Sequence, residues 1–306
     1  MQKNSPPLRD KLRGKPAQVI EELRPGQSIE LLQELHILTR EGKLNQDTRR
    51  KLKQVYHLYQ FIEPLLNEVS GGGQGFTLAD HGAGKSYLGF ILYDLFFNVA
   101  RQGEPVSGHV YGIETRAELV EKSRALAARL GFANMSFLNL SVQEATASAE
   151  LPPRVDIVTA LHACDTATDD AIAFGLARQA CHMVLVPCCQ AEVAGVLKKS
   201  RALNLAKSPL AELWRHPLHT REFGSQITNV LRCLQLEANG YQVTVTELVG
   251  WEHSMKNELI LASRPSTPSA AKTRAAQTRL QQVLAELGLG ELTARFAVSA
   301  GNAEAA

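Results

Sequence analysis

Cysteine, aromatic residues and net charge are all scarce in this chain. Five cysteines occur in 306 residues, and their odd number and spacing do not suit a framework of disulfides. The chain has no CxxC pair, so a structural zinc site is not expected, and a reducing compartment fits the cysteine usage best. The net charge of +2 is too small to identify a nucleic-acid-binding protein by itself.

Long apolar runs and a secretion signal are also missing. The first residues, MQKNSPPLRDKLRGK, contain no apolar signal-peptide core, and the most apolar stretch, LGFILYDLFFNVA, is interrupted by Asp94. We therefore expect a cytoplasmic protein that does not enter a membrane. Hydrophobic residues at 44% and charged residues at 21% are typical of a folded globular chain.

The distribution of apolar residues divides the chain into three predicted parts. Residues 1–70 show apolar residues at helical spacing and are expected to form an N-terminal helical cap. A glycine-rich run at 70–75 marks the boundary to a second part, residues 71–265. Residues 266–306 are expected to form a mobile linker and a short C-terminal helix at 280–287. The basic charge of this linker predicts a solvated tail or, less readily, a contact with nucleic acid.

The second part alternates short apolar runs with helical patterns. Such alternation predicts an α/β protein with a mostly parallel, doubly wound, Rossmann-like sheet. The last two strands are expected to form an antiparallel pair at the edge. The expected strands are FTLAD, HVYGIE, MSFLNL, RVDIVTALHA, HMVLVPCC, YQVTVTELV and ELILASR.

The strongest chemical signal is the run FTLADHGAGKSYLGF, in which an apolar strand leads into glycines that open a helix. A triphosphate loop would need glycine at Ala79, and a dinucleotide loop would need a third glycine at Tyr87. Asp80 would also repel phosphate. An acid just before Gly82 and Gly84 instead suits a cationic or zwitterionic ligand, such as the aminocarboxypropyl and sulfonium groups of S-adenosylmethionine.

The second predicted strand ends in Glu114, where nucleotide-binding α/β folds place an acid that accepts hydrogen bonds from both ribose hydroxyls. The alternative role is electrostatic, because a carboxylate is favourable near the start of the helix that follows at Arg116. Since Asp80, Gly82, Gly84 and Glu114 occur in the order that a cofactor site requires, we predict that Glu114 binds the ribose.

A resemblance to a family rests on the motifs DHGAGKSYLGF, GIE, ALHACDTATDDAI, VPCCQ and HSMKNELI in this order. The chain resembles the class I S-adenosylmethionine-dependent methyltransferases over residues 50–264. It is similar within them to the methyltransferase-like group that includes the methyltransferase domain of glutathione S-transferase C-terminal domain-containing protein. The resemblance implies a Rossmann-like core with S-adenosylmethionine at the C-terminal edge of the strands. The predicted cofactor-binding residues are Asp80, Gly82, Gly84, Lys85, Glu114, Gln143 and Leu161.

The predicted catalytic residues are His162, Asp165 and Cys188, at the strand ends where the resemblance places the reacting methyl group. His162 can act as a base near neutral pH, although a strand-end imidazole satisfied by the backbone explains it equally well. The chain lacks [DN]PP[YF], which disfavours amino-group methylation by that motif. Cys164 and Cys188 end neighbouring strands as in RNA cytosine-5 methyltransferases. We nevertheless expect direct transfer, because cysteines at apolar strand ends usually pack.

Two basic segments favour RNA as the acceptor. One is the cluster between Arg40 and Lys53, and the other is Arg215–Phe223, which a surface loop explains equally well. The predicted function is a methyltransferase that acts on ribosomal or transfer RNA. A protein side-chain methyltransferase and a non-catalytic module that binds S-adenosylmethionine or RNA are the alternatives. We expect no metal ion as cofactor, and the oligomeric state is left open.

Overall fold

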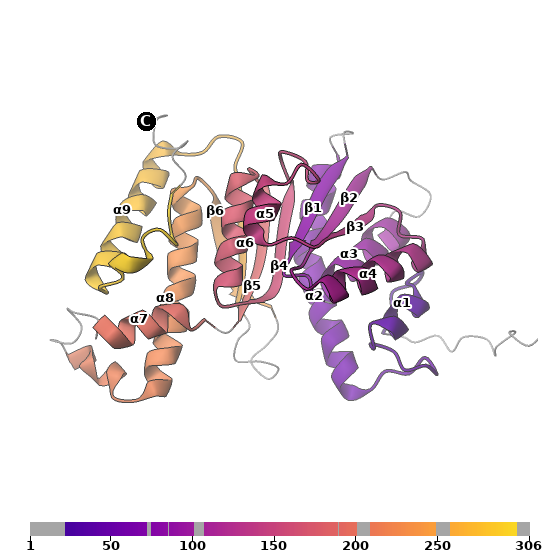
Figure 1. The fold of residues 1–306 in the computed structure, drawn as a ribbon, viewed down its shortest axis with the longest axis horizontal. Helices are drawn as coiled ribbons and strands as arrows, with labels where there is room; N and C mark the ends of the chain where they lie inside the picture. The colour runs from indigo at the N-terminus through magenta and orange to yellow at the C-terminus, as the bar shows by residue number, and fades with distance from the viewer. Residues whose placement is uncertain are drawn as a thin grey trace, which may run out of the picture.

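Seven strands in the described part of the chain form one sheet through the middle of the molecule (Figure 1). The computed structural model describes residues 22–71, 75–84, 86–100, 107–188, 190–200, 209–248 and 258–298. The strand order is β3-β2-β1-β4-β5-β7-β6, and β7 runs opposite to the other six described strands. The strands are β1 (Phe76–His81), β2 (Gly108–Ile113), β3 (Met135–Leu138), β4 (Ile157–Cys164), β5 (His182–Cys188), β6 (Gln242–Glu247) and β7 (Glu258–Ser263).

This topology confirms the predicted Rossmann-like α/β fold, including the antiparallel pair at the edge. The central strands are apolar without alternation because helices cover both faces of the sheet, and six of the seven residues of β5 are buried. Strand β6 lies at the edge, and its residues are exposed or half-buried. Because β1 pairs with β2 on one side and with β4 on the other, the strand order reverses at β1. Ligands of open α/β sheets bind at such a reversal, beyond the carboxyl ends of the strands.

Helices cover the two faces of this sheet with separate hydrophobic cores. Residues of α1 to α4 share one core with β1, β5 and β7, whereas α5, α6 and α8 pack on the opposite face. The helices are α1 (Ile29–Glu34), α2 (Gln46–Ser70), α3 (Tyr87–Tyr93), α4 (Ala117–Leu130), α5 (Val142–Ala147), α6 (Thr166–Ala177), α7 (Glu192–Ser200), α8 (Pro217–Ala238) and α9 (Ala270–Glu286). A π-helical segment, η2 (Asp94–Ala100), continues α3, and the 3₁₀ segments are η4 (Pro209–Trp214) and η5 (Gly290–Leu292).

The N-terminal helices pack on the sheet. Helix α2 starts with a capping box between Asn45 and Thr48, and its apolar side, including Tyr59 and Ile62, is buried in the same core as β1. Upstream of it, the backbone N–H of Ser28 donates to the buried carboxylate of Asp94 at 3.0 Å. The first helices are thus part of the core of the α/β unit, and the prediction that they form a cap over a pocket stays a prediction.

The C-terminal helix is longer than the sequence pattern indicates. We expected a linker from residue 266 and a helix over 280–287, whereas α9 begins at Ala270 and has 17 residues. The expectation was wrong because the prolines and serines of this segment lie before Ala270. Residues 270–279 are rich in alanine and also contain arginine and glutamine, which favour a helix. Leu280 and Leu284 then anchor the helix in a third core, together with α7 and α8.

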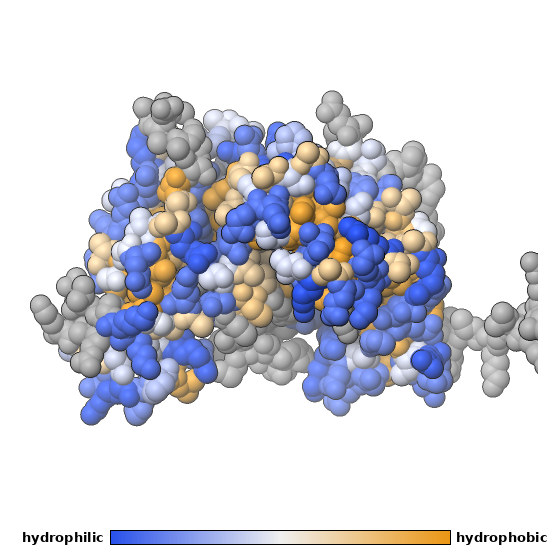
Figure 2. All heavy atoms as spheres, viewed as in Figure 1, coloured by the Kyte–Doolittle hydropathy of each residue, from blue (hydrophilic) through white to orange (hydrophobic). Residues whose placement is uncertain are grey.

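Two helical projections flank the sheet on the same side (Figure 1). The amino end of α2 lies on the side of the sheet where the parallel strands end (Figure 1). Helix α7 follows the carboxyl end of β5, and η4 and the start of α8 lie beside it at the lower left of Figure 1. Figure 2 shows both projections as largely hydrophilic on the face in view.

Candidate functional site at the carboxyl ends of the strands

The glycine turn after β1 is tied to the end of β2. Gly82 and Gly84 have positive φ angles of +63° and +56°, which L side chains rarely adopt, so the backbone here depends on glycine. The N–H of Ala83 donates to the carbonyl of Ile113 at 3.1 Å, and the N–H of Gly84 donates to Oε2 of Glu114 at 2.7 Å. The structure therefore joins two predicted cofactor-binding residues, Gly84 and Glu114, that are thirty positions apart in the sequence.

Glu114 is a buried carboxylate with an exposed partner. It accepts hydrogen bonds from the Arg116 backbone N–H at 3.1 Å and from the Arg116 Nε at 3.0 Å. Burial by itself would raise the Glu114 pKa, but the hydrogen bonds from Arg116 and Gly84 outweigh it and hold the pKa below its usual value. The Arg116 side chain is 62% exposed, so it can turn away from the carboxylate at little cost in buried contacts.

Asp80 points into the protein between β4 and α3. It is 2% exposed, and its Oδ1 accepts a hydrogen bond from the Thr159 hydroxyl at 2.7 Å. Burial raises the pKa of this carboxyl to about 7, although hydrogen bonds from Thr159 and the Gly89 backbone oppose the shift. Its charge is therefore partial at neutral pH, which weakens the electrostatic argument made from the sequence. The prediction that Asp80 contacts the cofactor stays a prediction.

His81 follows Asp80 and was not recognised in the sequence. Because neighbouring residues of a strand face opposite sides of a sheet, His81 points toward α6, where its ring centroid lies 4.2 Å from that of Phe174. Burial lowers its pKa to about 3, so the imidazole is neutral, and its Nε2 has no hydrogen-bond partner among the described residues. Nothing in the sequence distinguishes this buried histidine from an exposed one.

Asp165 occupies a strained turn between β4 and α6. Its φ is +49°, and its Oδ1 accepts hydrogen bonds from the backbone N–H groups of Ala191 at 2.9 Å and Glu192 at 3.2 Å. The carboxylate thus satisfies donors at the start of α7 and links the end of β4 to the segment that follows β5. This arrangement gives Asp165 a structural role, and the predicted catalytic role is untested.

The ends of β4 and β5 bring two cysteines together. Cys164 is exposed and Cys188 is half-buried, and their Sγ atoms are 3.2 Å apart. Leu161 is half-buried in the core of the α2 face. His162 belongs to β4, but the placement of its side chain lies outside the described residues.

Two further predicted cofactor-binding residues have no role that the structure defines. Gln143 is an exposed residue in the first turn of α5, after β3. Lys85 lies outside the described residues, as does Cys189 of the motif after β5. Both roles stay predictions. The end of β4 adjoins the glycine turn, since a Cβ at Gly82 would be 3.9 Å from the Ala163 Cβ.

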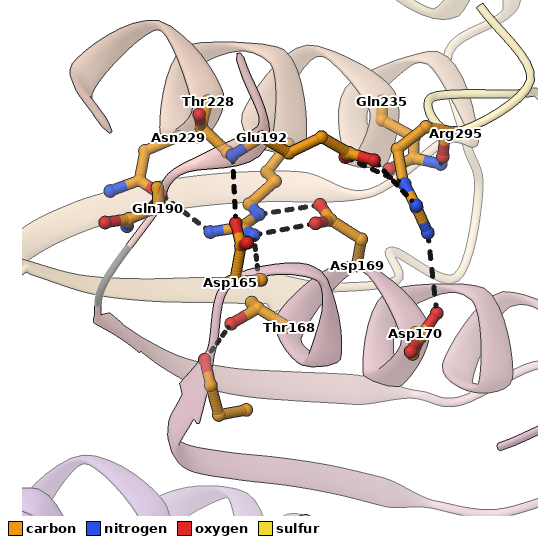
Figure 3. A network of polar contacts seen from close by, with 12 residues as sticks. Asp165, Thr168, Asp169, Asp170, Gln190, Glu192, Thr228, Asn229, Gln235 and Arg295 are labelled. Carbon is orange, nitrogen blue, oxygen red and sulfur yellow. Dashed lines mark hydrogen bonds and ion pairs between the residues drawn. The ribbon is translucent and has the colours of Figure 1, made fainter. Parts of the chain in front are cut away.

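A buried ion pair between Arg232 and Asp169 adjoins the Asp165 turn (Figure 3). It was not predicted from the sequence. Arg232 of α8 is fully buried, and its Nε and Nη2 donate to the Asp169 carboxylate at 2.7 and 2.8 Å. The same Nη2 donates to the backbone carbonyl of Asp165 at 2.8 Å, and Nη1 donates to Asn229 at 3.1 Å. The network therefore connects α8, α6 and the carboxyl end of β4.

A cavity of ≈ 690 Å³ lies in the projection formed by α7, η4 and the start of α8. Its lining includes the aromatic ring of Trp214 and three basic side chains, those of Lys198, Arg215 and Arg221. Arg215 and Arg221 belong to the basic segment noticed in the sequence. Arg215 also pairs with Glu212 at 2.8 Å, so part of its charge is neutralised.

Neither a metal cluster nor a membrane span is found among the described residues. No group of three or more histidine, cysteine, aspartate or glutamate side chains in that part of the chain is placed to hold a metal ion. None of the described helices combines the length and the apolar character that crossing a membrane requires.

Residues 50–196 match the family model described as a methyltransferase domain. The match starts inside α2 and ends within α7, so it includes the glycine turn, Glu114 and the ends of β4 and β5. The middle of this chain is therefore similar to a methyltransferase domain. The matched residues make up slightly less than half of the sequence. No curated protein matches the chain.

Solved structures resemble the chain at low sequence identity. An rRNA methylase from Streptococcus thermophilus is 9% identical, with 67% of this chain and 94% of that chain covered and a TM-score of 0.41. Magnesium protoporphyrin IX methyltransferase from Synechocystis, with bound SAH, is 18% identical, with 78% and 96% covered and a TM-score of 0.41. A candidate O-methyltransferase from Klebsiella pneumoniae is 12% identical, with 81% and 94% covered and a TM-score of 0.47. Likenesses this distant carry no argument about the activity of this chain.

Proposed function

We propose that this chain is an S-adenosylmethionine-dependent methyltransferase. The observation that carries the proposal is the hydrogen bond between the Gly84 N–H and the Glu114 carboxylate. It fixes an acid beside a glycine turn at the point where the strand order reverses, and ligands of such sheets bind there. The family match to a methyltransferase domain includes both residues and supports the same chemistry.

The residues at the turn fit an adenosine-containing ligand. The Glu114 carboxylate is buried and is oriented by the Gly84 N–H, so it can accept hydrogen bonds from the two hydroxyls of a ribose. The exposed Arg116 side chain, which now bonds to it, must then move aside. The glycines leave the backbone at the turn open to close approach. Asp80, Lys85, Gln143 and Leu161 complete the proposed cofactor-binding set.

S-adenosylmethionine, when bound, supplies a methyl group that is already activated by its sulfonium. The protein then needs to hold the acceptor in line and to exclude water, and positioning supplies most of the rate. His162, Asp165 and Cys188 are the residues proposed to stand on the acceptor side. The Asp165 carboxylate acts there by holding α7 against the end of β4. The finer resemblance, to glutathione S-transferase C-terminal domain-containing proteins, also stays a proposal.

We infer that RNA is the acceptor. The support is the position of the two basic segments, because both belong to projections on the side of the carboxyl ends of the strands (Figure 1). Arg50, Lys51 and Lys53 are exposed on the amino end of α2. On the other projection, Lys198, Arg221 and Trp214 line one cavity, and basic and aromatic residues together suit phosphate contacts and base stacking.

Calorimetry tests the proposed cofactor. S-adenosylhomocysteine should bind, and ATP and NAD should bind far more weakly, because the turn lacks both phosphate-binding patterns.

Glu114→Ala should weaken binding of S-adenosylhomocysteine by about tenfold to a hundredfold, since a hydrogen bond to a charged group contributes about 1.5–3 kcal/mol. Glu118→Ala, which changes an exposed acid in the first turn of α4, is the matched control and should leave the affinity unchanged. Equal effects of the two variants, or equal affinity for ATP, would contradict the proposed site.

Mass spectrometry of RNA and protein from cells with and without this chain tests the acceptor. Loss of a methyl mark from ribosomal or transfer RNA is the expected result. Loss of a protein mark would replace RNA by a protein side chain. Tight binding of S-adenosylhomocysteine with no lost mark would identify a module that binds the cofactor without catalysis.

A further inference from the structure

The cysteines at the ends of β4 and β5 are brought together by an irregularity in β4. Leu161 pairs with Val186, and a register shift follows, after which Cys164 pairs with Cys188. Without the shift, continued pairing would place Cys164 opposite position 189. One extra residue in β4 therefore sets the two cysteines directly opposite each other. Such bulges occur near active sites, where they redirect a side chain.

The geometry of this pair lies within the reach of a disulfide. Neighbouring strands of a sheet are about 4.8 Å apart, and bridged cysteines have Cα atoms about 4.4–6.8 Å apart. The two Sγ atoms are 3.2 Å apart, against about 2.05 Å in a disulfide, so the sulfurs need to approach by only about 1 Å.

The other described cysteines lie in different surroundings. Cys233 of α8 packs against the core on the α6 face of the sheet, and burial raises the pKa of its thiol to about 12, which leaves it protonated and unreactive. Cys181 lies at the opposite end of β5, beside the guanidinium of Arg154. Among the four described cysteines, Cys164 is the one that is exposed to solvent, so a small reagent can reach it.

We propose that Cys164 and Cys188 form a redox-reactive dithiol that exchanges with a small-molecule disulfide such as glutathione disulfide. In the first step the Cys164 thiolate attacks one sulfur of the reagent, which forms a mixed disulfide and releases one thiol. Cys188 then attacks the Cys164 sulfur, which forms the Cys164–Cys188 bond and releases the second thiol. Two cysteine thiols are oxidised, one small disulfide is reduced to two thiols, and the two protons go to the thiols released.

The bond would fasten the carboxyl ends of β4 and β5 to each other. These ends form the edge at which we propose that the acceptor binds, and Asp165 follows Cys164 directly. The dithiol itself does not depend on the proposed function, because its formation is measured as a chemical bond and not as methyl transfer.

Equilibration of the full chain with mixtures of reduced and oxidised glutathione, followed by alkylation and trypsin, tests the proposal. Cleavage after basic residues gives one peptide, 155–178, with Cys164 as its single cysteine, and another, 179–198, with Cys181, Cys188 and Cys189. The expected result is a cross-link between the two peptides that dithiothreitol reverses, with fragment ions that place it at Cys164 and Cys188.

Serine variants identify the partner. Cys188→Ser should abolish the cross-link, whereas Cys181→Ser and Cys189→Ser should retain it. A cross-link that survives Cys188→Ser, or that disappears in Cys189→Ser, would overturn the pairing. Glutathione adducts without any cross-link over the whole range of mixtures would overturn the proposal itself. Fragment ions from the unsubstituted chain give the same decision if a variant does not fold.

Discussion

Two adjacent side chains at the end of β1 give the folded protein opposite responses to pH. The Asp80 carboxyl has a pKa raised by burial to about 7, so the folded protein keeps a proton that the unfolded chain loses, and stability falls as the pH rises from about 4 to 7. The His81 imidazole has a pKa lowered by burial to about 3. Between pH 6.5 and 3 the unfolded chain binds a proton at His81 that the folded protein excludes, so stability falls as the pH falls.

His81→Phe isolates the second effect. The phenyl ring keeps an aromatic group against Phe174 and removes the titration. Relative to the unsubstituted protein, the variant should gain stability by roughly 1 kcal/mol for each pH unit below 6.5, because its unfolded chain no longer binds the extra proton. Denaturant unfolding at pH 6.5, 5.5 and 4.5 gives the difference, and the contribution of Asp80, present in both proteins, cancels. A difference in unfolding free energy that does not vary with pH would show that His81 titrates normally in the folded state.

The same residues show what a sequence predicts and what it does not. The turn at Gly82 and Gly84 and the acid Glu114 beside it are visible in the sequence, because a turn that needs positive φ and an acid at the end of the next strand leave marks at fixed places. Their role in binding a cofactor stays a prediction. The burial of His81 leaves no such mark. The orientation of Asp80 toward Thr159 also depends on β4, which lies far away in the sequence.

At the scale of elements, one buried charge on α8 holds the turn that follows the carboxyl end of β4. Arg232 gives two hydrogen bonds to Asp169 on α6 and one to the carbonyl of Asp165, whose own carboxylate holds α7 (Figure 3). The helical pattern of α8 is visible in the sequence, but the partner of its arginine is not, because the two residues are 63 positions apart. Elements were therefore predictable here, and the contacts that orient them were not.

Asp169→Asn should destabilise the fold by about 3–5 kcal/mol, because it leaves the Arg232 guanidinium buried without its counter-charge. Glu237→Gln is the control, since it breaks the exposed pair with Arg279, at 2.8 Å, and should cost at most about 1 kcal/mol. Both free energies are measured by denaturant unfolding. If the two variants lose the same amount, the buried pair contributes no more than a surface pair and α8 must be held by its apolar contacts.

At the scale of the whole molecule, residues buried in a hydrophobic core continue along the chain to Phe296, two residues before the last described residue. The third core joins α7 and α8 to Leu284 of α9 and to Phe296 beyond η5. The family match ends within α7 and does not include these residues. The sequence pattern predicted only part of α9, because the apolar residues of a helix that packs on one neighbour are few and its first half is polar.

The C-terminal segment should therefore contribute to global stability. Leu284→Ala removes a side chain that is 5% exposed, and it should lower the free energy of unfolding by about 2–5 kcal/mol. Gln281→Ala, on the exposed side of the same helix, keeps the helix propensity and should change it by less than about 0.5 kcal/mol. Thermal and denaturant unfolding of the full chain measure both. A Leu284→Ala variant as stable as the control would mean that α9 does not pack on α8 in solution. A large loss in a single cooperative transition would instead show that α7, α8 and α9 unfold together with the sheet, so that the projection carrying Trp214 and the basic side chains has its position set by the same core.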